Sequence, residues 1–134
     1  MKMDEVEGIG PIEAEKLALA GIATAEALLE IGAKPGGRAA VSKATGISDT
    51  RILKWVNQID LMRIKGVGSE FSDLLEMAGV DSPAELANRN AANLATTFQE
   101  VVAARPDTVR RIPSETEVAG WIAPAKGMPK VVEH

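Results

Sequence analysis

Residues 6–10 read VEGIG and residues 64–68 read IKGVG, so the same pattern of two glycines set one residue apart occurs twice in the chain. We call these segments the first and second hairpins. Each is followed by an amphipathic stretch that ends in Ala-Gly and a branched apolar residue, at 20–22 and at 78–80. Glycines ahead of a helix allow a tight turn, and they also let backbone N–H groups approach a phosphate. The pattern alone leaves both roles open.

The similarity between the two halves extends beyond the hairpins, as expected for an internal repeat. Residues 6–29 align with residues 64–87 at an offset of 58, and a second match follows at an offset of 66. The change of offset indicates an eight-residue insertion, which we expect to lengthen a helix near 91–104. The second match pairs Ser48 and Trp55 with Ser114 and Trp121.

Composition and capping residues favour an all-helical fold. Aromatic residues make up only 3% of the chain and alanine is abundant, which suits packed helices better than a sheet. We therefore predict two four-helix units, 1–63 and 64–134, packed as a pseudo-symmetric duplication. Serine or threonine N-caps and the apolar periodicity define the helices. They are expected near 11–20, 25–31, 37–44 and 49–62, and near 69–78, 83–88, 91–104 and 115–126.

The two tryptophans are predicted to be core residues. Trp55 lies on an apolar stripe of helical spacing with Ile52, Val56 and Ile59, and Trp121 repeats its position. Neither is expected to stack on nucleic-acid bases. The C-terminal residues 128–134 are expected to be loosely held.

Charge and residue content exclude several classes of function. The formal net charge of −4 gives no global attraction to nucleic acid. The absence of cysteine excludes thiol chemistry, and no apolar run is long enough to cross a membrane. The only histidine, His134, is C-terminal, and neither a metal-loop spacing nor a nucleophile motif occurs. We expect a cytoplasmic protein that is not an enzyme and binds no metal or cofactor.

Positive charge is concentrated in the middle of the chain. Seven basic residues and only two acids lie between Lys34 and Lys65. The first sixteen residues instead carry five acids against Lys2 and Lys16, so the first hairpin would repel a phosphate. We interpret the first hairpin as structural only. Arg51 and Lys54 are predicted to lie on the face of their helix that points away from Trp55.

These residues resemble helix-hairpin-helix proteins, in which two helices are joined by a turn of the pattern apolar-Gly-apolar-Gly. RIKGVGSEFSDLLEMAGV (63–80) is a good match, and Thr45-Gly46-Ile47 looks like a weaker one, which we call the middle hairpin. The order of elements is also similar to the SAM-like fold of the carboxyl-terminal domain of the bacterial RNA polymerase alpha subunit. Over nearly its whole length the chain resembles an uncharacterised bacterial family of tandem helix-hairpin-helix proteins.

The resemblance implies that hairpin N–H groups and nearby basic residues hold phosphates of duplex DNA without reading bases. Ser48 and Ser69 are expected to cap the helices that follow the middle and second hairpins. An alternative remains open, in which the chain is a scaffold for a protein partner or for self-association and binds no nucleic acid. The residues expected to bind nucleic acid are Lys43, Gly46, Ser48, Arg51, Lys54, Arg63, Lys65, Gly66, Gly68 and Ser69.

Overall fold

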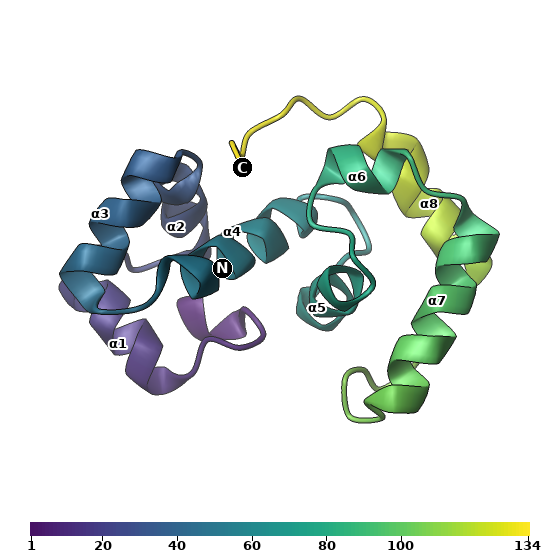
Figure 1. The fold of residues 1–134 in the computed structure, drawn as a ribbon, viewed down its shortest axis with the longest axis horizontal. Helices are drawn as coiled ribbons and strands as arrows, with labels where there is room; N and C mark the ends of the chain where they lie inside the picture. Colours follow the sequence, from purple (N-terminus) through teal and green to yellow (C-terminus); the bar gives the residue numbers. More distant parts are fainter. The chain divides into compact units, whose positions relative to one another are not determined.

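The fold is all-helical, as the sequence predicts. The computed structural model describes all of residues 1–134 and contains eight α-helices, one short 3-10 helix and no strand (Figure 1). Every predicted helix is present, with ends within about two residues of the expected ones. The elements are η1 (Met3–Glu5), α1 (Pro11–Leu19), α2 (Ala25–Gly32), α3 (Pro35–Thr45), α4 (Asp49–Leu61), α5 (Ser69–Met77), α6 (Pro83–Ala87), α7 (Ala91–Ala104) and α8 (Glu115–Ala125).

The chain forms two compact units. The first comprises Met1–Asp60 together with Val131–His134, and the second comprises Leu61–Lys130. The division falls in the last turn of α4, a few residues before the expected boundary at residue 63. The C-terminal residues therefore belong to the first unit and not to the second.

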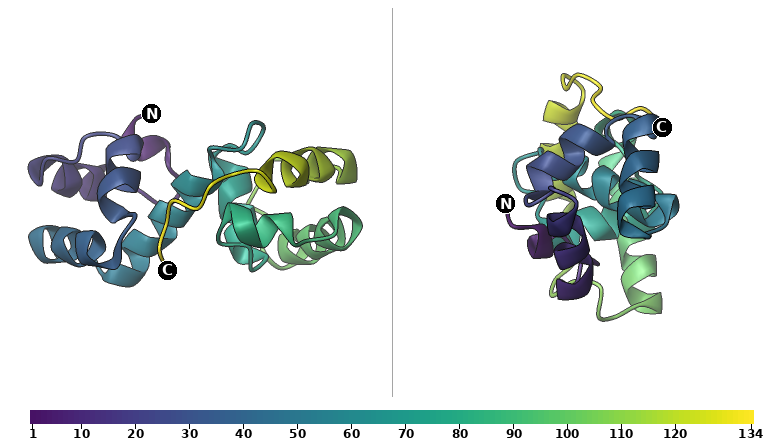
Figure 2. Two further views of the ribbon diagram at one scale, coloured as in Figure 1. Left: turned by 90° about the horizontal axis from the view of Figure 1, so that it is seen from above. Right: turned by 90° about the vertical axis from the view of Figure 1, so that its left-hand side faces the viewer.

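The last four residues are held in place, so the expectation of a loosely held tail is wrong for them. Val132 is buried, and the Glu133 N–H group donates to the Ala33 carbonyl at 2.7 Å. His134 Nε2 lies 2.8 Å from Asn57 Oδ1 on α4. Figure 2 shows this C-terminal segment in yellow, extended and without helix.

The first unit buries one apolar face from each of its helices. α3 packs against both α1 and α2. The buried stripe of α4 includes Ile52, Trp55 and Val56, as predicted. Thr24 caps α2 by accepting the Ala27 N–H group.

The second unit has one contiguous core. α8 packs against α6 and α7, and α7 also packs against α5. Leu74, Phe98 and Trp121 are among the buried residues of this core. Ser114 and Glu117 form a capping box at the start of α8.

Paired positions of the two units adopt the same backbone conformation. Gly8 and Gly66 have φ of 93° and 94°, a left-handed region that favours glycine. Gly21 and Gly79 end α1 and α5 with φ of 87° and 89°. The two helices also end with the same hydrogen bond. The N–H group of Ile22 donates to the Leu17 carbonyl, and that of Val80 donates to the Leu75 carbonyl, each five residues earlier in the chain.

Each hairpin packs against the tryptophan of its own unit, a contact that the sequence pattern does not predict. A Cβ atom added to Gly8 would lie 3.5 Å from Trp55 Nε1, and one added to Gly66 would lie 3.0 Å from Trp121 Nε1. The positive φ favours glycine at both positions, and at Gly66 the indole also leaves little room for a Cβ atom, whereas the separation at Gly8 is an ordinary contact. Trp55 and Trp121 are both buried, as predicted.

The extra length of the second unit lies mainly in a connection and less in a helix. α7 spans 91–104 as expected and is somewhat longer than α3. Residues 46–48 alone join α3 to α4, whereas residues 105–114 join α7 to α8. The prediction that the insertion lengthens the helix is therefore only partly right.

Candidate nucleic-acid interface

The second hairpin presents its glycines and a lysine at the surface. Ile64 and Val67 are buried, and the Val67 N–H group donates to the Ile64 carbonyl at 3.0 Å. Burying these two apolar side chains leaves Lys65, Gly66 and Gly68 exposed between and beside them. The hairpin therefore exposes to solvent the glycines and the lysine that would contact a phosphate.

The start of α5 carries no capping side chain. Gly68 is the N-cap, with φ −89° and ψ −170°, and Ser69 is the first helical residue. The expectation that Ser69 caps this helix is therefore wrong. A Cβ atom on Gly68 would meet nothing within 4 Å, so the space on that side of the N-cap residue is open. Backbone N–H groups of a first helical turn carry a partial positive charge that favours anions.

The acid in the first turn of α5, Glu70, is paired with an arginine. Both of its carboxylate oxygens accept from Arg110, one from the backbone N–H group at 3.2 Å and the other from Nε at 3.1 Å. Arg110 thus neutralises the carboxylate in the first turn of α5. The result is a helix start whose nearest exposed charge within the hairpin is Lys65.

The first hairpin has the same turn and a different helix start. Gly10 is the N-cap of α1, and Pro11 follows it and has no N–H group. Glu13 Oε1 accepts the Gly10 N–H group at 3.0 Å. Glu7 is exposed beside the glycines. A carboxylate already occupies the place an anion would take.

The middle hairpin uses its backbone groups internally. Gly46 ends α3 in a left-handed conformation and donates its N–H group to the Ser42 carbonyl at 2.8 Å. The Ile47 N–H group donates to Thr45 Oγ1 at 3.2 Å. Ser48 Oγ accepts the Arg51 N–H group at 3.3 Å, in agreement with the predicted cap. The Gly46 amide is therefore not available to a phosphate, contrary to expectation.

Arg51 lies against the tryptophan, not on the opposite face. Its guanidinium carbon is 5.0 Å from the centre of the Trp55 ring, and Nη2 is 3.9 Å from Glu13 Oε1. The predicted orientation is wrong because a residue four positions before Trp55 shares its side of the helix. About half of the Arg51 side chain remains exposed. Lys43 and Lys54 are exposed as well.

Arg63 and Lys65 are the exposed basic residues of the second unit that precede its hairpin glycines. Arg63 Nη2 donates to the Pro129 carbonyl at 3.5 Å, a long contact that leaves the side chain exposed. The ten expected residues thus divide between the units, with Lys43 to Lys54 in the first and Arg63 to Ser69 in the second.

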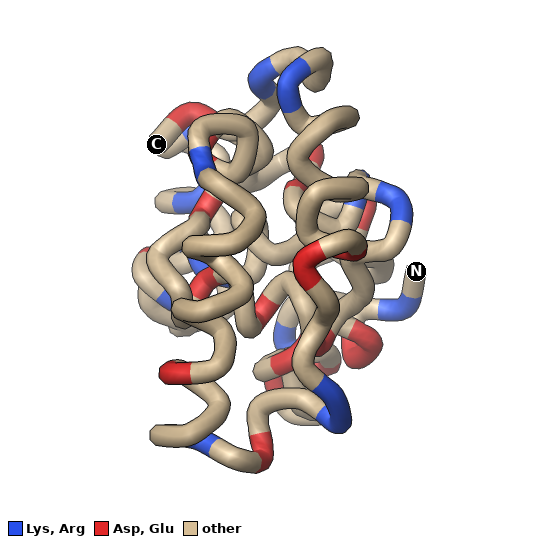
Figure 3. Tube along the Cα trace, turned by 90° about the vertical axis from the view of Figure 1, so that its right-hand side faces the viewer, with Lys and Arg blue, Asp and Glu red and all other residues tan.

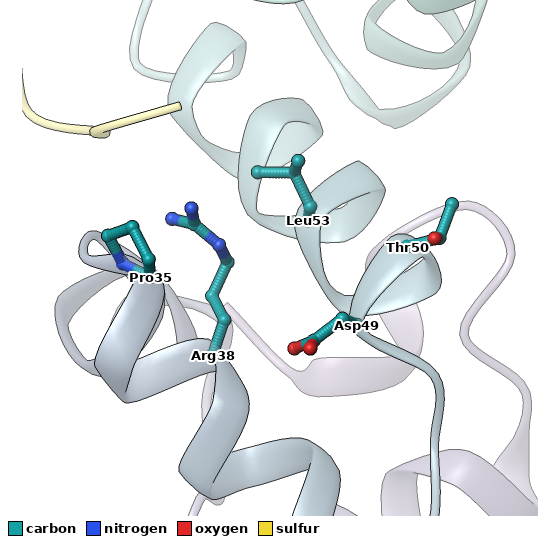
Figure 4. A pocket seen from close by; sticks show the side chains of 5 residues that line it. All are labelled: Pro35, Arg38, Asp49, Thr50 and Leu53. Atoms are coloured by element: carbon teal, nitrogen blue, oxygen red, sulfur yellow. The ribbon is translucent and has the colours of Figure 1, made fainter.

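One of the seven basic residues between Lys34 and Lys65 is buried and forms hydrogen bonds within the first unit. Arg38 is buried, and its Nη1 donates to the carbonyls of Gly32 and Ala33 at the end of α2, at 2.9 and 3.3 Å. Figure 4 shows Arg38 and Asp49 pointing toward the space between α3 and α4, where they line an open pocket of about 260 Å³. Because Arg38 holds the carbonyls of a helix end, it adds little to the charge of the surface.

Charges of both signs are interspersed along the trace (Figure 3). In the second unit Arg111 forms a bidentate pair with Glu117, at 2.7 and 2.9 Å. The bonds from Arg111, and then from the Ser114 N–H group, lower the pKa of the Glu117 carboxyl to about 2. The same carboxylate raises the pKa of Arg111. The exposed basic residues of this unit include Arg63 and Lys65 at the second hairpin, and also Arg105, Lys126 and Lys130.

No group of histidine, cysteine, aspartate or glutamate side chains in the structure is arranged to hold a metal ion. None of the helices has the length and apolar character that crossing a membrane would require.

The family model described as "Domain of unknown function (DUF4332)" matches residues 7–128, and the chain belongs to this family. The match covers the second hairpin, both tryptophans and all of the first hairpin except Val6. No curated protein and no solved structure is a match for the chain.

Proposed function

We propose that the chain is a non-catalytic helix-hairpin-helix module that binds duplex DNA through phosphate contacts, without sequence specificity. The second hairpin is the principal contact. The observation that carries the proposal is the open start of α5, where Gly68 brings no side chain and Lys65 stands exposed beside the glycines. The dipole of the helix and the lysine charge add at this point.

Lys43, Arg51 and Lys54 supply a second, weaker basic surface on the first unit. They contribute side-chain charge and not hairpin amides, since the Gly46 N–H group is already bonded. Arg51 alone of the three has a side chain able to form paired bonds to a base edge, and its guanidinium lies over Trp55 and close to Glu13, so we expect little reading of bases. Binding is therefore weak, sequence-independent and strongly dependent on salt.

The test is a fluorescence anisotropy titration of a duplex of about 20 base pairs at several salt concentrations. With about four phosphates neutralised, log K falls against log salt with a slope of about −3 to −4. The double variant R63E/K65E is expected to lose binding while its helicity and melting temperature stay near those of the parent. A matched control, K16E/K126E, makes the same change in net charge at exposed lysines that are not among the residues expected to bind nucleic acid.

A second variant tests the backbone donors directly. Ser69→Pro gives the second hairpin the proline that the first has at the same place, Pro11. Proline is well tolerated at the first helical position, and the extended conformation of Gly68 suits a residue before proline. The variant removes one N–H donor, so we expect about a tenfold loss of affinity, the equivalent of one charge-assisted hydrogen bond of about 1.5 kcal/mol. If the parent does not bind duplex at low salt, or R63E/K65E binds as well as the parent, the proposal is wrong.

A further inference from the structure

The outer face of α1 exposes two large apolar side chains. Ile12 is 66% exposed and Leu19 is 83% exposed, the highest values among the large hydrophobic residues of the chain. Their separation of seven residues places them on one side of the helix, with Glu15 and Lys16 between them. We call these four residues the α1 face. All four are exposed.

The corresponding face of α5 is covered. At the offset of 58 residues, the α1 positions 12, 16 and 19 correspond to Glu70, Leu74 and Met77. Leu74 is fully buried in the core of the second unit, and the other two are half-buried. The same side of the equivalent helix is therefore an interface within the second unit and a bare surface in the first.

The cover of α5 comes from the extra length of the second unit. Arg105, the first residue after α7, donates from Nη1 to Met77 Sδ at 3.9 Å, and Arg110 pairs with Glu70. Met77 also lines a small pocket together with Val101 and Ala104 of α7. The end of α7 and the connection 105–114 thus place apolar side chains flanked by arginines over the face of α5.

The first unit has no such segment. α3 ends at Thr45, and residues 46–48 lead directly into α4. Nothing in the chain takes the place that Val101, Arg105 and Arg110 take in the second unit. Ile12 and Leu19 stay in water for this reason.

Exposed acids outnumber exposed basic residues on and before α1, and this charge indicates what would cover the α1 face. Asp4, Glu5, Glu7 and Glu15 are exposed, against Lys2 and Lys16. This acidic surrounding repels nucleic acid and suits the basic, apolar character of the segment that covers α5. The long stem of Lys16 can pack against an apolar neighbour while its ammonium group stays in water.

We propose that the α1 face is a docking surface for an amphipathic helix of a partner protein, one whose apolar side chains are flanked by arginine or lysine. The partner helix occupies the position over α1 that the end of α7 and residues 105–114 occupy over α5. The surface is independent of the second hairpin. Because only two large apolar side chains are offered, the interaction is of the small, transient kind.

The test uses a synthetic peptide with the sequence of residues 91–111, which contains α7 and the first part of the basic connection. It is titrated into the ¹⁵N-labelled full chain and followed by NMR. We expect saturable shift changes at the amides of α1, and at least a fivefold weakening when Arg105, Arg110 and Arg111 of the peptide are replaced by glutamate. The variant I12S/L19S should lose the interaction, and the control I31S, which removes another exposed apolar side chain, should keep it.

Three outcomes would overturn the proposal. The first is the absence of shifts in α1. The second is shifts confined to α5–α8, which would mean that the peptide only replaces its own counterpart in the second unit. The third is concentration-dependent self-association in sedimentation that I12S/L19S abolishes, which would assign the face to a second copy of the chain. I12S/L19S should keep the helicity and the duplex affinity of the parent, so a failure here is distinguishable from a failure of the phosphate contact.

Discussion

The two hairpins share a backbone and differ in chemistry. In both, the first glycine has a positive φ and lies against the indole nitrogen of a buried tryptophan. In the first, Pro11 and Glu13 fill the helix start, whereas in the second Ser69 follows an open N-cap and Glu70 is turned to Arg110. The difference teaches that the turn is retained for packing, while its ability to meet an anion depends on three or four neighbouring side chains.

The helices that follow the hairpins differ in the same way. One face of α5 is covered by the end of α7 and its connection, whereas the corresponding α1 face is exposed. The longer connection, 105–114 against 46–48, is enough to turn a surface into an interface, because it adds arginines and apolar side chains at one place. Function in such a chain is therefore to be sought where the two units differ.

The largest expected effect tests whether the tryptophans are equivalent. Trp55→Ala and Trp121→Ala should each lower the free energy of unfolding by about 3–5 kcal/mol, since each removes a large buried side chain. Urea unfolding followed by circular dichroism measures the loss. A cost below about 1 kcal/mol for one of the two would break the equivalence of the units.

The helices and the core could be predicted from the sequence because their signals are local. Thr24, Ser82 and Ser114 mark helix starts, and each accepts the expected backbone N–H group. The burial of Trp55 and Trp121 follows from a periodicity of a few residues. Local rules of this kind operate within one or two helical turns.

The candidate site was predictable only in part, because its contacts join distant segments or depend on side-chain direction. Nothing near Glu70 in the sequence indicates that its carboxylate pairs with Arg110. The burial of Arg38 depends on the position of the end of α2. The stacking of Arg51 on Trp55 is different, because the spacing of four residues does indicate a shared side of the helix.

A smaller effect distinguishes the two turns. Gly66→Ala should cost more than Gly8→Ala, although both residues have the same φ and a left-handed alanine costs about 1–2 kcal/mol at either position. At Gly66 the new Cβ atom would also lie 3.0 Å from Trp121 Nε1, so the indole must shift, whereas the 3.5 Å separation at Gly8 is an ordinary contact. Chemical unfolding of both variants gives the comparison.

The matched control for these variants is Gly68→Ala. Gly68 has a negative φ and no atom near the place of a Cβ, so alanine there should cost only what a poorer N-cap residue costs, roughly 0.5–1 kcal/mol. A loss at Gly68 as large as that at Gly66 would show that the positive φ and the indole contact are not the cause. Equal losses of stability in Gly8→Ala and Gly66→Ala would mean that the positive φ alone causes the loss. The contact with Trp121 would then have no part in it.

The smallest expected effect concerns acid. The pKa of Glu117 is lowered to about 2 by Arg111 and by the Ser114 N–H group, whereas its ordinary value is 4.5. A carboxyl whose pKa is depressed by folding stabilises the fold fully above its ordinary pKa and loses that contribution as the pH falls. The second unit should therefore lose a part of its stability between about pH 4.5 and pH 2.

The first unit carries no acid at the matching position, which is Arg51. It has a different acid-sensitive group, because the N-terminal ammonium lowers the pKa of Glu26 by a hydrogen bond. The two units must therefore be observed separately, with Trp121 fluorescence in a Trp55→Phe background reporting on the second. In that background Glu117→Gln should flatten the dependence of unfolding on pH across this window, and Glu115→Gln, which alters an exposed acid of the same helix turn, should not. If the pH dependence is unchanged in Glu117→Gln, the pairing of Glu117 with Arg111 and Ser114 does not cause the loss of stability of the second unit in acid.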